Sequence, residues 1–196
     1  MFTFFDDSPI DFVFRMLYNI YNGIVCFAKE RIKTMDRVTK QNYYLDIAQT
    51  VSERSTCLRK RYGAIIVKND SIISTGYNGA PRGRQNCSDL GHCTRNKLGI
   101  PRGERYELCR SVHAEANAII AAQRDQMLDA TLYMVGINSE SGELESGTCS
   151  CMMCKRMIIN AGIAKVVVRD TKESYREIDV NEWIENDDSL SGVFGY

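Results

Sequence analysis

Two short motifs, each at the predicted start of a helix, constrain the fold of this chain most strongly. In "TCSCMMC", Cys151 and Cys154 lie three residues apart, so their sulfurs project from one face of a first helical turn. Upstream, in "HAEANAII", His113 and Glu115 lie at the start of another predicted helix. A helix and a strand separate the two motifs in the sequence, and the fold has to bring them together if they act as one site.

The cysteine content fits two classes of protein. Eight cysteines in 196 residues could form a secreted disulfide scaffold or a set of metal ligands. The first apolar stretch, "IDFVFRMLYNIYNGIVCFA", is interrupted by polar and charged residues and has no small-residue cleavage site, so it predicts neither a signal peptide nor a membrane span. We therefore expect a reduced, cytoplasmic protein whose cysteines bind metal.

Charge narrows the choice of partner. The chain has 25 Lys+Arg and 25 Asp+Glu, so its formal net charge is zero. A polynucleotide-binding chain usually presents a basic face. The balance predicts a small-molecule substrate and neither polynucleotide nor membrane as partner.

The hydrophobic pattern predicts an α/β domain with helices on both faces of a sheet. The residues from 77 to 112 show no period, and a loop of that length needs something to hold it. The predicted elements are helices at 42–53, 113–125, 151–162 and 179–186, a hairpin of strands at 63–68 and 71–76, and strands at 130–137 and 163–170.

Three segments are expected along the chain. Residues 1–34 form an N-terminal helical extension, with a helix from about residue 10 to 33 opened by Ser8 and Pro9. Met35 is an alternative natural start, and the sequence leaves both interpretations open. Residues 35–180 form the main domain, and 181–196 form a short helix and a loose tail.

The two motifs are more specific together than apart. A lone H-x-E is weak, and a lone C-x-x-C could be a redox pair or half of a zinc finger. In combination they are typical of zinc-dependent nucleobase deaminases. Two thiolates and an imidazole hold zinc and leave its fourth position for water. A carboxylate that is not a ligand, here Glu115, can then move the water's proton.

With these motifs, the chain resembles the deoxycytidylate (dCMP) deaminase family, which includes the ComEB-type proteins. The segments that carry the resemblance are "ERSTCLRKRYGAIIVK", "IISTGYNGAPRG", "IPRGERYELCRSVHAEANAI", "ATLY" and "CMMCKRMIINAGIAKVVV", within about 40–170. The "STGYNGxPxG" stretch is the discriminating piece within the wider zinc deaminase group. The resemblance implies a three-layer α/β/α cytidine-deaminase-like sandwich with a central mixed sheet of about five strands. It also implies hydrolysis of dCMP to dUMP and ammonia.

The resemblance also implies site residues. His113, Cys151 and Cys154 would hold the catalytic zinc, with Glu115 as proton shuttle. One departure is Ser150, which stands where the family has proline; serine is itself a good helix-start residue, so we expect zinc binding to be kept. Cys149 falls outside the helical turn and is the spare thiol.

Substrate contacts follow from the same resemblance. The side chain of Asn78 would hydrogen-bond the sugar, and the backbone of Ala114 would contact the cytosine edge. For the 5′-phosphate, charge and proximity to the motifs suggest three arginines: Arg82, Arg54 and Arg110.

A second, structural zinc would hold the long loop at 77–112 in place. Cys57 and Cys87 match ligand positions of such a site in the family, and Cys93 and Cys109 are the favoured remaining ligands, with His92 as a substitute for one. The alternative is that these cysteines are buried free thiols that pack as small hydrophobes. Cys26 has no such neighbours and is expected to be a packing residue.

Regulation and partners are implied by resemblance alone. The family often assembles as hexamers, activated by dCTP and inhibited by dTTP with Mg²⁺ accompanying the nucleotide. Two alternatives stay open. One is a deaminase-fold accessory protein of DNA uptake, which the complete zinc motif and the neutral charge disfavour. The other is a deaminase of dCTP, CMP or a modified nucleoside.

Overall fold

The computed structural model describes residues 13, 16–20, 37–101 and 103–186. The chain divides into two compact units, Met1–Val38 and Thr39–Tyr196, which are described separately. In the first unit, residues 13 and 16–20 are helical; the other positions of the helix predicted at 10–33, and the tail from 187, lie outside the described residues. Among the described residues no helix has the length and apolar character to cross a membrane. The predicted boundaries at 34 and 180 stay predictions.

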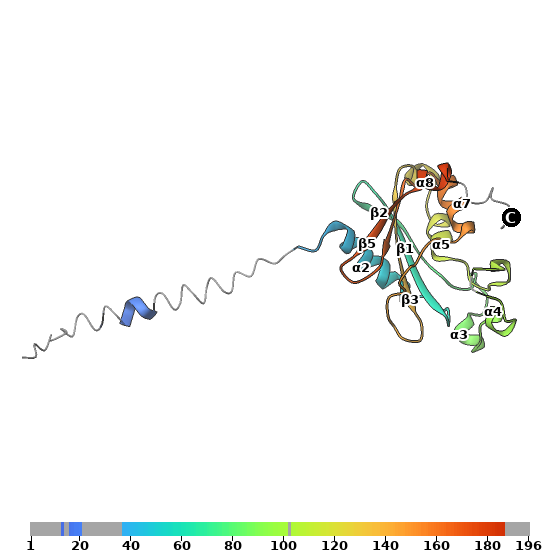
Figure 1. Ribbon diagram of the computed structural model, residues 1–196, viewed down its shortest axis with the longest axis horizontal. Coiled ribbons are helices and arrows are strands. Elements are labelled where there is room, and N and C mark those ends of the chain that lie inside the picture. Colours follow the sequence, from blue (N-terminus) through green and yellow to red (C-terminus); the bar gives the residue numbers. More distant parts are fainter. Residues whose placement is uncertain (1–12, 14–15, 21–36, 102, 187–196) are drawn as a thin grey trace, which may run out of the picture. The chain divides into compact units, whose positions relative to one another are not determined.

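The second unit is built on one mixed sheet of five strands in the order β2-β1-β3-β4-β5 (Figure 1). Strands β3 and β4 are parallel, and the other neighbours are antiparallel. This confirms the predicted α/β class with a five-stranded mixed sheet. The elements are α2 (Lys40–Ser52), β1 (Lys60–Lys68), β2 (Ser71–Tyr77), α3 (Cys87–Leu90), α4 (Thr94–Lys97), η1 (Tyr106–Leu108), α5 (Ala114–Ile120), α6 (Arg124–Met127), β3 (Thr131–Asn138), α7 (Met152–Ala161), β4 (Lys165–Arg169), β5 (Tyr175–Asp179) and α8 (Val180–Glu185).

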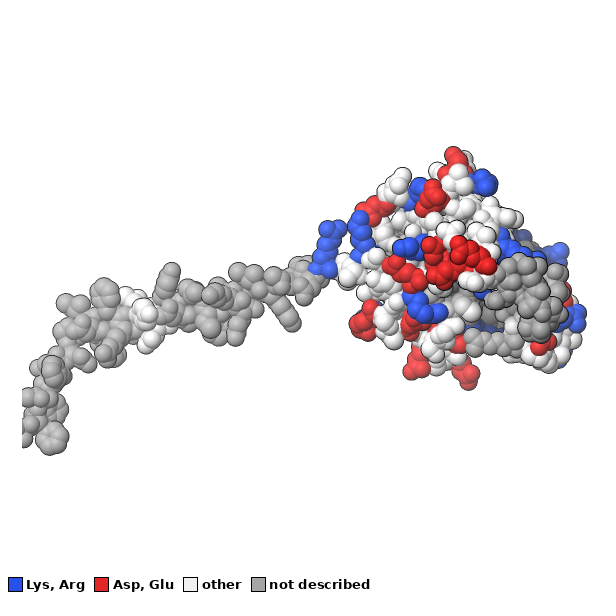
Figure 2. All heavy atoms as spheres, turned by 45° about the horizontal axis from the view of Figure 1, so that its top comes forward, with Lys and Arg blue, Asp and Glu red and all other residues white. Residues whose placement is uncertain are grey.

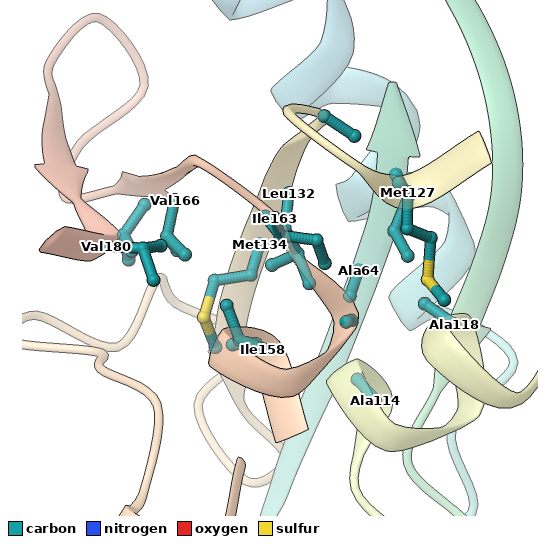
Figure 3. Close-up of a cluster of buried hydrophobic side chains, with 14 residues drawn as sticks. Ala64, Ala114, Ala118, Met127, Leu132, Met134, Ile158, Ile163, Val166 and Val180 are labelled. Atoms are coloured by element: carbon teal, nitrogen blue, oxygen red, sulfur yellow. The ribbon is translucent and has the colours of Figure 1, made fainter. Parts of the chain in front are cut away.

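Helices cover both faces of the sheet because the strand residues alternate between two apolar clusters. On one face, Ile65 of β1, Val135 of β3 and Val167 of β4 pack with Leu45 and Ala48 of α2. The cluster on the opposite face joins the sheet to α5, α6, α7 and α8, as Figure 3 shows; its members include Ala64, Ile66, Ala114, Ala118, Met127, Leu132, Met134, Ile158, Ile163, Val166 and Val180. The outer surface in Figure 2 carries charges of both signs, interspersed.

The strands and most helices lie where the pattern predicts them. The hairpin turn is at Asn69 and Asp70, which both have positive φ (48° and 64°), as a two-residue turn between twisted strands requires. Helix α7 ends at Gly162 in the left-handed conformation, with φ of 77°.

The secondary structure differs from the expectations in three places. The single helix predicted at 113–125 is two: α5 ends at Ile120, and α6 starts after Gln123, which has extended backbone. The break turns Met127 into the core, where it is 4% exposed, whereas Ile120 is 72% exposed. Strand β5 was not predicted, because its sequence "YREID" is charged and only partly buried. The segment after β2, expected to be loop, contains the one-turn helices α3 and α4 and the 3₁₀ turn η1.

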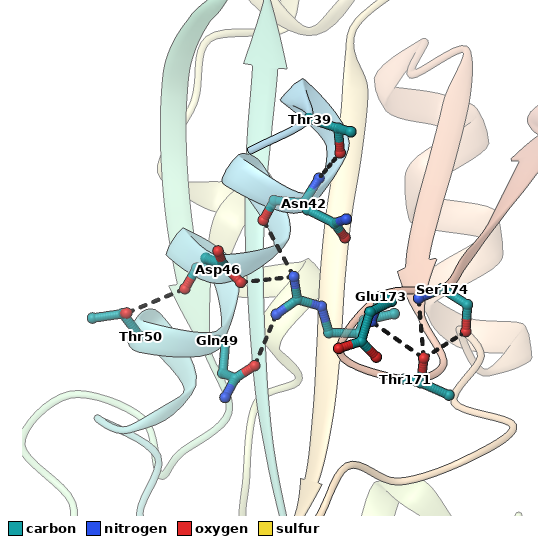
Figure 4. Close-up of polar contacts among 9 residues, drawn as sticks. Thr39, Asn42, Asp46, Gln49, Thr50, Thr171, Glu173 and Ser174 are labelled. Atoms are coloured by element: carbon teal, nitrogen blue, oxygen red, sulfur yellow. Dashed lines mark hydrogen bonds and ion pairs between the residues drawn. The ribbon is translucent and has the colours of Figure 1, made fainter. Parts of the chain in front are cut away.

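A buried arginine fastens α2 to the end of β4 (Figure 4). The Arg169 guanidinium forms an ion pair with Asp46 at 2.7 Å, donates to the side-chain oxygen of Gln49 at 2.9 Å and donates to the carbonyl of Asn42 at 3.2 Å. Its side chain is 1% exposed, whereas that of Asp46 is 58% exposed. The guanidinium thus links three turns of α2 to the sheet.

We expect Arg169→Ala to lower the free energy of unfolding by about 3 kcal/mol, because it removes a buried cation's hydrogen bonds and its packing. The matched control is Lys165→Ala on the same strand, whose ion pair with Glu177 is about half exposed and should contribute less than about 1 kcal/mol. Urea unfolding of both variants checks this; equal losses would show that burial of Arg169 adds nothing.

Candidate metal centre and active site

Two helix starts on the same side of the sheet form the centre of the site. His113 is the N-cap of α5 and Cys151 is the N-cap of α7, both with extended backbone (φ −71° in each). Cys154 lies in the first turn of α7 and is fully buried. The sulfurs of Cys151 and Cys154 lie 3.4 and 3.3 Å from Nδ1 of His113.

These three side chains fit a zinc ion. Their ligand atoms all lie within 4.8 Å of one another, and among the described residues no other His, Cys, Asp or Glu side chains form such a group of three. Two sulfurs and one imidazole nitrogen are the donor set of a zinc site with an open fourth position. The structure brings the three predicted ligands together.

The hydrogen bonds among these groups shift their pKa values. The hydrogen bond with Cys154, helped by that with His113, lowers the pKa of Cys151 to about 4 despite burial. The same bond between the thiols, together with burial, raises the pKa of Cys154. Burial lowers the pKa of His113, but the hydrogen bond with Cys151 and the charge of Glu115 outweigh it and raise the pKa. The thiolate is the form of cysteine that binds metal, and the lowered pKa keeps Cys151 in that form at neutral pH.

Glu115 lies in the first turn of α5 and is 4% exposed. Burial raises the pKa of its carboxyl group, while the charge of His113 and a hydrogen bond from Ser150 oppose that rise. A carboxyl group with a raised pKa exchanges a proton more readily near neutral pH than an exposed one does. Ser150, the residue that replaces the family's proline, is therefore also a partner of Glu115.

A pocket of about 120 Å³ opens beside this centre, and His113, Glu115 and Cys151 line it. Asn78 lines it too, but protein groups hold its side chain: the oxygen accepts from Ser55 Oγ at 2.6 Å and from the Tyr62 amide at 2.7 Å, and the nitrogen donates to the Lys60 carbonyl at 2.9 Å. The second amide hydrogen of Asn78 has no hydrogen-bond partner among the described residues. Ala114 is fully buried and is not among the lining residues.

The three arginines expected near the phosphate differ in position. Arg110 lines the pocket and donates from Nε to the Gln85 carbonyl at 2.7 Å. Arg54 and Arg82 are exposed and are not among the lining residues. Sequence reasoning missed two other lining arginines, Arg59 and Arg95. Neither lies in a periodic segment, so no signal short of the fold could have identified them.

The four loop cysteines gather around the same pocket: Cys57, Cys87, Cys93 and Cys109 all line it. Burial raises the pKa of Cys87, and the charges of the other three thiols add to the rise. Their sulfurs are not all within 4.8 Å of one another, since this set is not among the groups at ligand spacing. His92 is exposed, with Nδ1 3.0 Å from the Leu90 carbonyl. The seven described cysteines form no disulfide.

The family model for the cytidine and deoxycytidylate deaminase zinc-binding region matches residues 38–170. The chain belongs to this deaminase family. It is 34% identical to the deoxycytidylate deaminase of Schizosaccharomyces pombe over 131 residues, 67% of this chain and 37% of that protein. It is 36% identical to the deoxycytidylate deaminase of Mycobacterium phage D29, over 68% of this chain and 96% of that protein.

Among solved structures, the dCMP deaminase of cyanophage S-TIM5 in complex with dCMP and dUMP is similar to this deaminase-family chain. The identity is 26% and the TM-score 0.46, with 68% of this chain and 84% of that one covered. The chain spans less than two thirds of the length of the fungal relative, and nearly all of the phage D29 relative.

We expect Cys154→Ser to lose about one zinc per chain relative to the unsubstituted protein, because a hydroxyl is a poor replacement for a thiolate ligand. Cys149→Ser is the matched control: it changes a neighbouring, exposed thiol outside the ligand group and should keep its zinc. Metal analysis of both purified variants checks this. Zinc loss in Cys149→Ser, or none in Cys154→Ser, would contradict the assignment.

Proposed function

We propose that this protein is a zinc-dependent hydrolase that converts dCMP and water to dUMP and ammonia. The observation that carries the proposal is the convergence of His113, Cys151 and Cys154 within 4.8 Å, with the buried carboxyl group of Glu115 on the same pocket. The named activity of the relatives supports the choice of dCMP.

The chain's own residues suit each part of this reaction. His113, Cys151 and Cys154 would hold the zinc ion, which would act as a Lewis acid toward the attacking water. Glu115 accepts the proton of the attacking water, passes a proton to the ring nitrogen and assists departure of the amino group as ammonia. Because burial raises its pKa, Glu115 can hold a proton between these steps and release it again.

We expect Glu115→Gln to lower kcat for dCMP by about 10²- to 10⁴-fold, because glutamine is nearly the same size and cannot carry the proton. Zinc content should be unchanged, since Glu115 is not among the ligands. The control is Glu182→Gln, which alters an exposed first-turn glutamate of α8. Ammonia release from dCMP measures both.

The same assay separates the alternatives. An accessory protein would release no ammonia from dCMP under any condition and would be indifferent to the loss of the Glu115 carboxylate. A faster reaction with dCTP, CMP or deoxycytidine would keep the chemistry and change the substrate. Activation by dCTP, inhibition by dTTP with Mg²⁺ and assembly into hexamers remain predictions from the resemblance, and a cytoplasmic location remains a prediction from the composition.

A second, structural zinc is proposed for Cys57, Cys87, Cys93 and Cys109. The support is their shared position around one pocket and the mutual effect of their charges. Zinc bound by the four sulfurs would offset the repulsion among their thiolates. It would join α3, the start of α4 and the segment before His113 to the loop between α2 and β1, which carries Cys57.

We therefore expect about two zinc ions per chain, and about one in Cys87→Ser, together with a lower thermal midpoint because metal binding contributes to folding. Cys149→Ser again serves as the control for a cysteine outside either site. A single zinc in the unsubstituted protein, with Cys87→Ser unchanged, would favour free thiols that pack as small hydrophobes.

A further inference from the structure

A buried cation lies on the wall of the active-site pocket. Arg95, in the one-turn helix α4, is 5% exposed and lines the same pocket as His113 and Glu115. Arginine is rarely buried to this extent without a charged partner. The surroundings of this guanidinium therefore indicate what the pocket is built to receive.

Two backbone carbonyls and an aromatic ring make the direct contacts of Arg95. Its Nη2 donates to the carbonyls of Pro101 and Glu104, each at 2.6 Å, and its guanidinium carbon lies 4.7 Å from the centroid of the Tyr106 ring. Nε is buried, and it has no hydrogen-bond partner among the described residues. No carboxylate of the described residues forms an ion pair with Arg95. The hydrogen bond from Arg105 lowers the pKa of Glu107 and the charge of Arg95 helps to lower it, so this exposed carboxylate lies within electrostatic range of the Arg95 guanidinium but forms its ion pair with Arg105. An anion that enters the pocket would give the buried guanidinium a direct charged partner.

Cationic side chains also outnumber anionic ones on the lining of the whole pocket. Three arginines line it, Arg59, Arg95 and Arg110, together with Lys60, which is paired with Glu145. The one carboxylate on the lining is Glu115, at the metal end. On the outer surface shown in Figure 2 the two signs of charge are interspersed. The lining itself therefore carries three arginines and Lys60 against one carboxylate.

Tyr106 lies between Arg95 and the metal centre and contacts both. The Tyr106 ring that lies under its guanidinium meets the His113 ring edge-on, with centroids 5.0 Å apart and planes at 86°. One aromatic ring therefore separates the cation from the imidazole that would hold zinc. In a nucleotide, the sugar similarly separates the reacting base from its 5′-phosphate.

We infer that Arg95 recognises the 5′-phosphate of the nucleotide and so gives the pocket its preference for a nucleotide over a nucleoside. This rests on the proposed function for the identity of the base. The two carbonyls and Tyr106 fix the guanidinium before the ligand arrives, so little side-chain freedom is lost on binding. Arg110, partly exposed and tied to Gln85 through Nε, is positioned to assist from the rim.

The experiment compares binding of dUMP and deoxyuridine, which differ only in the phosphate, to the zinc-loaded protein by calorimetry. Arg95→Gln should weaken dUMP by roughly 10- to 100-fold, the size of a lost charge-assisted contact, and change deoxyuridine by less than about threefold. Arg95→Lys keeps the charge and should show a smaller, partial loss of dUMP binding. Lys97→Gln removes an exposed cation from the same short helix and should match the unsubstituted protein for both ligands.

Other outcomes would overturn the inference. Equal weakening of dUMP and deoxyuridine in Arg95→Gln and Arg95→Lys would mean that Arg95 only supports Tyr106 and the loop. Unchanged dUMP binding would place the phosphate elsewhere. If Arg95→Gln fails to fold or to hold zinc, the ratio of the two dissociation constants in Arg95→Lys decides, and a ratio equal to that of the unsubstituted protein rejects the inference.

The result is separable from the proposed function. Selective loss of dUMP binding in a protein that releases no ammonia from dCMP would support phosphate recognition and reject the deaminase proposal. If Arg95→Gln lowers the deamination rates of dCMP and deoxycytidine by the same factor, the deaminase proposal is supported and phosphate recognition by Arg95 is rejected.

Discussion

The close approach of α5 to the sheet is the constraint on which the metal centre depends. A Cβ atom on Gly76 of β2 would lie 2.3 Å from both the Ala114 carbonyl oxygen and the Ala118 amide nitrogen, so only glycine lets α5 lie directly on the strand. On the opposite face, a Cβ on Gly63 would lie 1.9 Å from the Ala48 carbonyl of α2. The backbones of both helices therefore lie unusually close to the sheet. This close packing positions the first turn of α5, which carries the site residues.

The position of α7 follows from the order of the strands. Because β3 and β4 are parallel and adjacent, the chain has to cross over between them, and α7 is that crossover, packed on the same face as α5. Both helices present an N-cap residue to the same point, His113 from α5 and Cys151 from α7. The metal site is thus a consequence of two helices that start side by side.

The parts that sequence predicts well are those with a local cause. The zinc ligands have fixed spacing, the hairpin has its Asn69-Asp70 turn, and α7 has its terminal Gly162. Strand β5 has no comparable signal, because its charged sequence lacks apolar alternation and only its hairpin pairing with β4 makes it a strand. The same holds for Arg95: its burial depends on two carbonyls and a tyrosine supplied by a loop without periodicity.

The irregular segment between β2 and α5 acquires order from the polar groups around the pocket. Asn78 ties its start to β1, and Gly79 and Val112 pair as an isolated bridge that closes the segment directly before His113. Between these anchors, Arg95 binds the backbone of the segment that follows it. The pocket therefore attracts ions of opposite charge: the Cys151 thiolate and Glu115 attract a metal cation, and the arginines attract an anion. If the pocket holds the proposed nucleotide, its neutral base would therefore face the metal centre and its charged phosphate would face the arginines.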